Sequence, residues 1–79
     1  MRIIRKNVRG YFGMNRPAAI ALKLKSIPPE GTIYVSKELK GRMLKRTIAH
    51  EKFEQSLMER GVKYKKAHSA AMKWERNIK

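Results

Sequence analysis

The sequence predicts an α+β domain in which a small, mostly antiparallel sheet of two or three strands is followed by a C-terminal helical hairpin. Three observations favour this class. The chain has 79 residues, the size of a single domain. Its first part contains short β-branched segments separated by Gly and Pro. Its second part has helical periodicity on both sides of one glycine. We therefore expect a β-rich basic half over 1–35 and a helical hairpin over 36–79.

The β-rich half contains three segments with strand character. RIIRKNV, residues 2–8, has β-branched residues among charged ones, as in an edge strand. In AIALKLKSI, residues 19–27, Ile and Leu alternate with Ala and Lys, which is typical of a strand with one solvated face. TIYV, residues 32–35, is a short β-branched and aromatic segment after a PPEG turn. GYFGMNRP, residues 10–17, contains two glycines and a proline, so we expect a loop there.

The helical half begins at Ser36, a residue type that commonly caps helices. The first helix is expected over 37–60 and is weakened at Gly41. Gly61 is expected to end it, because glycine readily adopts the left-handed conformation that follows many helices. A second helix is expected over 64–77.

Three residues of the first predicted helix have metal-binding or acid–base chemistry and lie on or beside its apolar face. The predicted apolar stripe consists of Leu39, Met43, Phe53, Leu57 and Met58. A helix turns about 100° per residue, so His50 and Glu54 lie about 40° apart within that stripe. Glu51 lies on its flank.

The second predicted helix presents a matching pair of side chains. Its packing seam is expected to consist of Tyr64, His68, Ala71, Glu75 and Ile78. Glu54 lies seven residues before Gly61 and His68 lies seven after it, so both are about 10 Å from the turn and face each other. The interior of the hairpin is therefore expected to contain His50, Glu54, His68 and Glu75, with Glu51 adjacent.

Two interpretations of this cluster are open, because burying a charge costs on the order of several kcal/mol unless it is paired or binds a metal. In the first, His50–Glu75 and Glu54–His68 are ion pairs that fix the register of the two helices. In the second, His50, Glu54, His68 and Glu75 supply two imidazoles and one or two carboxylates to Zn²⁺ or another divalent ion.

The segment IAHEKFE, residues 48–54, resembles the metal-binding helix of the zincin metallopeptidases. The strand TIYV before it is similar to the strand that enters that helix, and the resemblance covers roughly residues 32–55. It implies that His50 is the first ligand and Glu51 the general base. Glu54 stands where zincins have their second histidine, and His68 would supply that imidazole from the next helix. The resemblance therefore implies a minimal or degenerate zinc metallohydrolase.

The charge of the chain indicates a second class of function. It carries 20 Lys and Arg but six acidic residues, a formal net charge of +14. Such a surface attracts polyanions, so the alternative function is a nucleic-acid-binding module whose His/Glu cluster is structural. The candidate contact residues are Arg2, Arg5, Lys6, Arg9, Lys63, Lys65, Lys66 and Lys73.

The absence of cysteine excludes disulfides and thiolate metal sites. A small chain of this kind is stabilised by close helix packing, by a metal held by His and carboxylates, or by oligomerisation into a homo-oligomer. The sequence contains neither a secretory signal nor an apolar segment long enough to span a bilayer. We therefore expect an intracellular, cytoplasmic protein.

Overall fold

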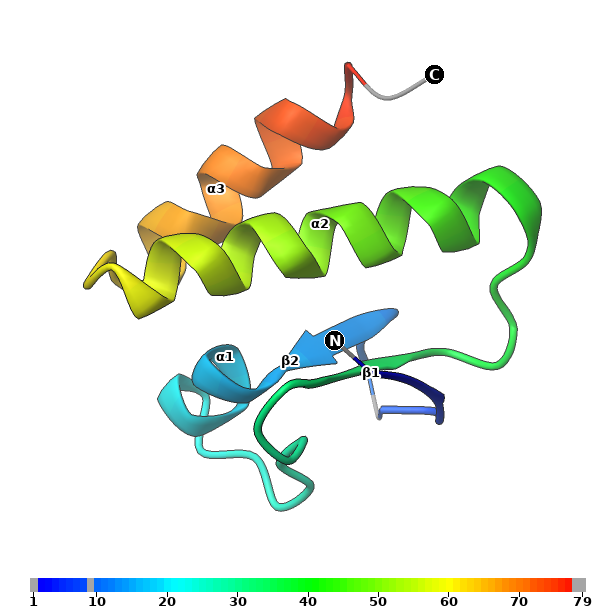
Figure 1. Ribbon diagram of the computed structural model, residues 1–79, viewed down its shortest axis with the longest axis horizontal. Coiled ribbons are helices and arrows are strands. Elements are labelled where there is room, and N and C mark those ends of the chain that lie inside the picture. Colours follow the sequence, from blue (N-terminus) through cyan, green and yellow to red (C-terminus); the bar gives the residue numbers. More distant parts are fainter. Residues whose placement is uncertain (1, 9, 78–79) are drawn as a thin grey trace.

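The structure is a computed structural model that describes residues 2–8 and 10–77. The described elements are β1 (Arg2–Arg5), β2 (Gly13–Asn15), α1 (Arg16–Ala21), β3 (Thr32–Val35), α2 (Gly41–Glu59) and α3 (Tyr64–Glu75). The long helix α2 lies in the middle of the molecule, with α3 packed along one side and the sheet and α1 on the other (Figure 1). Within this described part of the chain, no helix is both long and apolar enough to cross a bilayer.

The sheet is mixed, so the prediction of a mostly antiparallel sheet is wrong, although the broader α+β class agrees with the structure. Its strand order is β1-β3-β2. β1 runs parallel to β3, with Arg2 opposite Thr32, whereas β2 runs antiparallel to it, with Gly13 opposite Val35. Two parallel strands need a crossover connection, and here that connection carries β2 and α1. All four residues of the central strand β3 are buried.

The prediction of a strand over 19–27 is also wrong, because a helix begins just before it. The side-chain oxygen Oδ1 of Asn15 accepts a hydrogen bond from the backbone N–H of Ala18 at 2.8 Å, which caps the first turn of α1. Pro17 lies in that first turn, where its missing N–H costs no helical hydrogen bond. The segment expected to be a loop, residues 10–17, contains β2 as well as this helix start.

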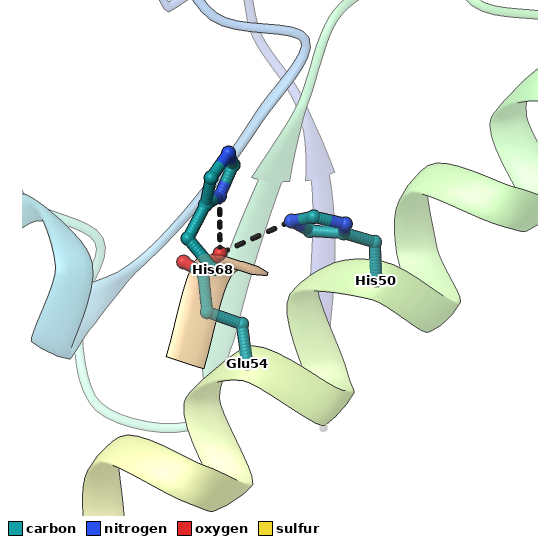
Figure 2. A group of neighbouring side chains, drawn as sticks. All are labelled: His50, Glu54 and His68. Carbon is teal, nitrogen blue, oxygen red and sulfur yellow. Dashed lines mark hydrogen bonds and ion pairs between the residues drawn. The ribbon is translucent and has the colours of Figure 1, made fainter. Parts of the chain in front are cut away.

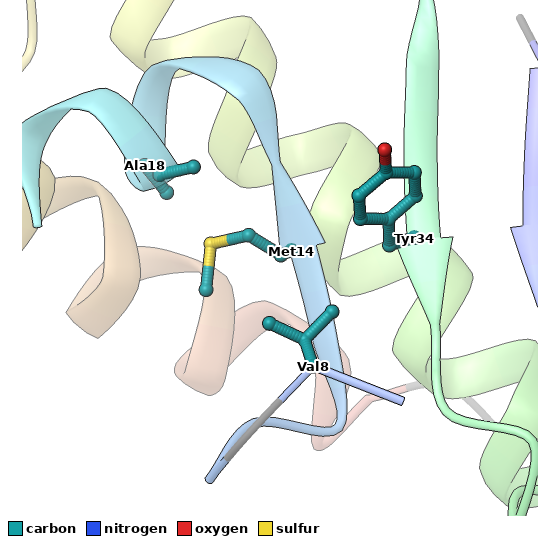
Figure 3. Packing of buried hydrophobic residues seen from close by; sticks show 5 residues of the cluster. Val8, Met14, Ala18 and Tyr34 are labelled. Atoms are coloured by element: carbon teal, nitrogen blue, oxygen red, sulfur yellow. The ribbon is translucent and has the colours of Figure 1, made fainter. Parts of the chain in front are cut away.

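The apolar core joins the sheet, α1 and the ends of the two long helices. Its buried cluster consists of Val8, Met14, Ala18, Ala19 and Tyr34 (Figure 3). Partly buried residues pack against this cluster, namely Ile4, Leu22, Leu24, Met58 and Tyr64. Two leucines of the wrongly predicted strand therefore still contribute to the core, but from the residues that follow a short helix.

Helix α2 begins at Gly41, four residues later than predicted. The hydroxyl oxygen of Ser36 accepts a hydrogen bond from the backbone N–H of Glu38 at 3.2 Å, and this local turn replaces the expected helix cap. α2 stops at Glu59, one residue before the predicted end, and Gly61 follows as expected with φ of +96°.

Helix α3 begins at Tyr64 as predicted and ends at Glu75, two residues before the predicted end. Its buried residues are Ala67 and Ala71, both 0% exposed. Such small side chains let α3 approach α2 closely. Ile78, expected in the packing seam, lies outside the described residues.

The buried face of α2 is polar, which is what creates the candidate site. Its buried residues are His50, Glu51, Glu54 and Gln55. Of the predicted apolar stripe, Met43 is 57% exposed and Leu39 lies before the helix. The helix therefore turns charged side chains toward β2 and α3.

Candidate metal centre

Three side chains converge on one point between α2 and α3. His50 and Glu54 lie one turn apart on α2, and His68 reaches them from α3 (Figure 2). Nε2 of His50 lies 3.0 Å from Oε2 of Glu54, and Nδ1 of His68 lies 2.8 Å from that same oxygen. One ligand atom from each residue lies within 4.8 Å of the other two. This group could hold a metal ion, and its helical faces are those expected from the sequence.

Aromatic packing keeps the two imidazoles in place. The rings of His50 and His68 meet edge to face with centroids 5.1 Å apart. His68 also stacks on Tyr64, with centroids 5.4 Å apart and 24° between the planes. The His68 side chain is 42% exposed, so the site is reached from solvent on the α3 side.

The buried charges stabilise one another. Burial alone raises the pKa of Glu54, but hydrogen bonds from His50, His68 and Asn15 outweigh burial and lower that pKa below its ordinary value. Burial alone lowers the pKa of His50, but the hydrogen bond to Glu54 and the charges of nearby carboxylates outweigh it and raise that pKa. Glu54 is therefore an anion at neutral pH, and it favours a cation beside it.

Glu75, expected among the metal ligands, lies on the other side of the His50 ring. Its Oε1 is 3.3 Å from Nδ1 of His50, whereas Glu54 is bonded to Nε2. A carboxylate on the far nitrogen of a metal-binding imidazole fixes which nitrogen is free for the metal. Both ion pairs expected from the sequence, His50–Glu75 and Glu54–His68, are present as contacts.

Glu51, the expected general base, lies beside the three converging atoms and is 5% exposed. Its Oε2 is 4.0 Å from Nε2 of His50. Burial, together with the charge of Glu54, raises the pKa of Glu51 to about 8. Gly13 of β2 packs directly on this side chain: a Cβ at Gly13 would lie 2.9 Å from Cγ of Glu51 and 2.9 Å from Cγ2 of Thr47. The absence of a side chain therefore lets β2 approach the helix.

Asn15 is a site residue that the sequence analysis missed. It is 0% exposed, and its Nδ2 donates to Oε1 of Glu51 at 2.9 Å and to Oε1 of Glu54 at 3.1 Å. Asn followed by Arg-Pro is a recognisable helix start, so the capping role of Asn15 has a sequence signal. Its contact with two glutamates 36 and 39 residues away has none.

A pocket of about 270 Å³ opens next to the cluster. It is lined by Gly10, Tyr11, Phe12, Gly13, Thr47, His50, Glu51, His68, Met72 and Glu75. Three of these residues are large and apolar yet well exposed: Tyr11 at 38%, Phe12 at 61% and Met72 at 42%. A small molecule or side chain in this pocket would lie against both imidazoles and Glu51.

The donor set suits a particular class of metal. Two imidazoles and one carboxylate are typical ligands of Zn²⁺, whereas Mg²⁺ and Ca²⁺ prefer oxygen alone. In a tetrahedral site with bonds of about 2.1 Å, neighbouring ligand atoms are about 3.4 Å apart. The two N···O distances of 2.8 and 3.0 Å are slightly shorter than this ligand-to-ligand distance, so small side-chain movements suffice to admit an ion.

Comparison with known proteins adds no family assignment. No protein-family model, no curated protein and no solved structure matches the chain. The zincin resemblance therefore stays a prediction.

The predicted nucleic-acid contacts that the structure describes belong to two separate parts of the fold. Seven of them are exposed, in or next to β1 and α3: Arg2, Arg5, Lys6, Lys63, Lys65, Lys66 and Lys73. The eighth, Arg9, lies outside the described residues. β1 and α3 are on opposite sides of α2 (Figure 1). Arg5 also has a structural role, since its Nη2 donates to the carbonyls of Lys37 and Leu39 at 3.0 and 2.6 Å.

Proposed function

We propose that this domain binds one divalent transition-metal ion, with zinc the best match, through Nε2 of His50, Oε2 of Glu54 and Nδ1 of His68. The supporting observation is that two imidazole nitrogens share one buried carboxylate oxygen. Two separate ion pairs would not require a common oxygen, whereas a metal ion requires ligand atoms around a common point.

Metal analysis of protein purified without a histidine tag tests this proposal. Zinc should bind near one equivalent, and His50→Ala, Glu54→Gln and His68→Ala should each lower the affinity sharply. Glu30→Gln, an exposed acid outside the cluster, is the matched control and should bind zinc like the wild type. Zinc binding that is equally strong in all four variants would refute the assignment.

We further propose that the site is hydrolytic. Three protein ligands leave a fourth position for water, and zinc lowers the pKa of a bound water to about 7. Glu51 lies beside that position without being needed as a ligand, and it lines the adjoining pocket. Burial favours the neutral form of Glu51, but a metal cation beside it would favour the carboxylate. That carboxylate would take the proton of the attacking water and pass it to the leaving group. The same role follows from the zincin resemblance.

Binding of single-stranded nucleic acid is a second candidate function, favoured by a different surface. Two of the six acidic residues, Glu51 and Glu54, are buried, so four remain to balance 20 Lys and Arg. A groove of about 440 Å³ on the α2–α3 surface is lined by Lys45, Ile48, Ala49, Lys52, Phe53 and Trp74. It contains two cations and no acidic residue.

The aromatic pair in this groove suits an unpaired base. Phe53 and Trp74 stack with centroids 4.7 Å apart and 8° between the rings, and Trp74 remains 39% exposed. An unpaired base stacks on exposed aromatic rings while lysines contact the backbone phosphates. Trp74 is the one tryptophan of the chain, so its fluorescence reports directly on this contact.

A further inference from the structure

We infer that Asn15 is a positioning residue of the metal site. Its side-chain amide holds one oxygen of Glu54, so that Glu54 binds the metal through the other oxygen alone, and it holds Glu51 beside the metal as a non-ligand. This inference rests on the proposed metal binding by His50, Glu54 and His68.

The orientation of the Asn15 amide is determined by its partners. Nδ2 has two hydrogens, and two carboxylate oxygens accept them: Oε1 of Glu51 at 2.9 Å and Oε1 of Glu54 at 3.1 Å. On the other side, Oδ1 accepts from the backbone N–H of Ala18 at 2.8 Å. A flipped amide would place oxygen against two carboxylates and NH₂ against an N–H donor. The hydrogen-bond network therefore selects one orientation.

This orientation assigns different roles to the two oxygens of Glu54. Oε1 is engaged by Asn15, whereas Oε2 accepts from both histidines. A carboxylate can bind a metal through one oxygen or through both. With Oε1 held by the amide, Glu54 supplies one ligand atom, the protein supplies three in all, and the fourth position stays open.

The same amide fixes Glu51. Its Oε1 is bonded to Asn15, and its Cγ lies against the backbone of Gly13. Gly13 and Asn15 are two residues apart in β2, so they lie on the same face of the strand, toward α2. Met14 between them belongs to the apolar core on the other face. One short strand thus both fills the core and positions the site.

Two substitutions separate the capping role of Asn15 from its positioning role. Asn15→Ser and Asn15→Asp both retain an oxygen that caps α1, but neither retains the amide donor. Loss of a group that orients metal ligands commonly weakens metal affinity roughly 10- to 100-fold. Asn7→Ser is the control, because Asn7 is exposed and contacts Ser36 and Lys37 instead of the site.

The experiment uses Co²⁺ as a spectroscopic substitute for Zn²⁺. We expect a strong four-coordinate visible spectrum for the wild type and for Asn7→Ser. For Asn15→Ser we expect a weaker, five-coordinate spectrum, because Glu54 can then turn both oxygens to the metal. For Asn15→Asp we expect metal affinity to fall roughly 10- to 100-fold. Circular dichroism should show unchanged helix content in both Asn15 variants, because the cap is retained.

The outcomes distinguish this inference from the metal proposal. A wild type that binds neither Co²⁺ nor Zn²⁺ would remove both. Wild-type binding with an unchanged spectrum and affinity in both Asn15 variants would overturn the positioning role and leave the metal site standing. If the variants do not fold, X-ray absorption of the zinc-loaded wild type decides: a carboxylate bound through both oxygens contradicts the inference, and four nearest neighbours support it.

Discussion

Nδ1 of His68 lies 2.8 Å from Oε2 of Glu54, a contact that joins α3 to α2 across the Gly61 turn. Because His50 shares that oxygen, removal of His68 affects both helices and the proposed ligand set at once. The contact therefore connects the stability of the hairpin with metal binding.

Zinc should raise the melting temperature, and EDTA should reverse the effect. Ligand at about 100 times its Kd stabilises a folded protein by about 2.7 kcal/mol. A domain of this size gains roughly 4–8 °C per kcal/mol, so a shift of roughly 10–20 °C is expected in a thermal melt. His68→Ala should lose most of this response, whereas Lys66→Ala, an exposed residue of the same helix, should keep it. Identical melts with zinc and with EDTA would contradict the proposal.

Glu51→Gln should separate metal binding from hydrolysis. Glutamine keeps the size of the side chain and an oxygen that can accept from Asn15, so fold and zinc content should be retained. It cannot take a proton from water, so any hydrolytic rate should fall roughly 10²–10⁴-fold. His50→Ala should instead lose both metal and activity. Glu59→Gln, an exposed acid of the same helix, serves as the control in assays of peptide and ester substrates. Full activity in Glu51→Gln would exclude its role as the base.

Stability without metal should fall as the pH rises from mildly acidic to mildly alkaline. The folded-state pKa of Glu51 is about 8, above its ordinary 4.5. The contribution of Glu51 to the stability of the fold is therefore full below pH 4.5 and is lost as the pH approaches 8. The raised pKa of His50 acts in the same direction above pH 6.5. The lowered pKa of Glu54 removes stability only as the pH falls below 4.5. The metal-free protein should therefore be most stable near about pH 5.

Zinc should reverse this trend, because metal binding displaces protons from its ligands and strengthens as the pH rises. The difference in melting temperature between zinc-loaded and metal-free protein should thus widen from pH 5 to pH 8. In metal-free Glu51→Gln the melting temperature should fall less steeply with pH, because glutamine has no carboxyl group that titrates. A metal-free protein whose melting temperature rises steadily over this range would show that the cluster does not titrate as described.

The residues of the cluster followed from helical geometry, whereas the partners supplied by the sheet did not. His50, Glu54 and His68 lie on long periodic segments, where about 100° per residue determines the face even though α2 begins four residues late. Asn15 and Gly13 reach the site through a strand of three residues, too short to give a periodic signal.

The pairing of the strands has a similar explanation. The alternation over 19–27 is typical of a strand, but the side-chain cap of Asn15 and the proline at position 17 favour a helix start just before it. With that helix in the connection, β1 and β3 become parallel neighbours. Strand pairing depends on such long-range contacts, which the composition of a segment does not contain.

Gly13→Ala should disturb the site through a single methyl group. The added Cβ would lie 2.9 Å from Cγ of Glu51 and 2.9 Å from Cγ2 of Thr47, closer than such atoms normally approach. Overpacking of this kind costs about 1–3 kcal/mol, to be measured by urea denaturation. Adding Thr47→Ala removes one of the two contacts and should restore part of the stability. A stable Gly13→Ala protein with unchanged zinc affinity would mean that β2 and α2 are not packed this closely.

Oligo(dT) should quench the fluorescence of Trp74 if the groove of Lys45, Lys52, Phe53 and Trp74 binds unpaired bases. Stacking on an aromatic ring contributes about 1–3 kcal/mol per base, and the phosphate contacts make affinity fall steeply with salt. Lys45→Glu with Lys52→Glu should weaken binding far more than the matched change of Lys23 and Lys25, which lie outside the groove. Trp74→Leu should weaken binding of oligo(dT) but not of heparin, a polyanion without bases. If both polyanions bind without quenching Trp74, and Trp74→Leu has no effect, the interaction is only general charge attraction. If oligo(dT) does not bind at 50 mM salt, the nucleic-acid function is excluded.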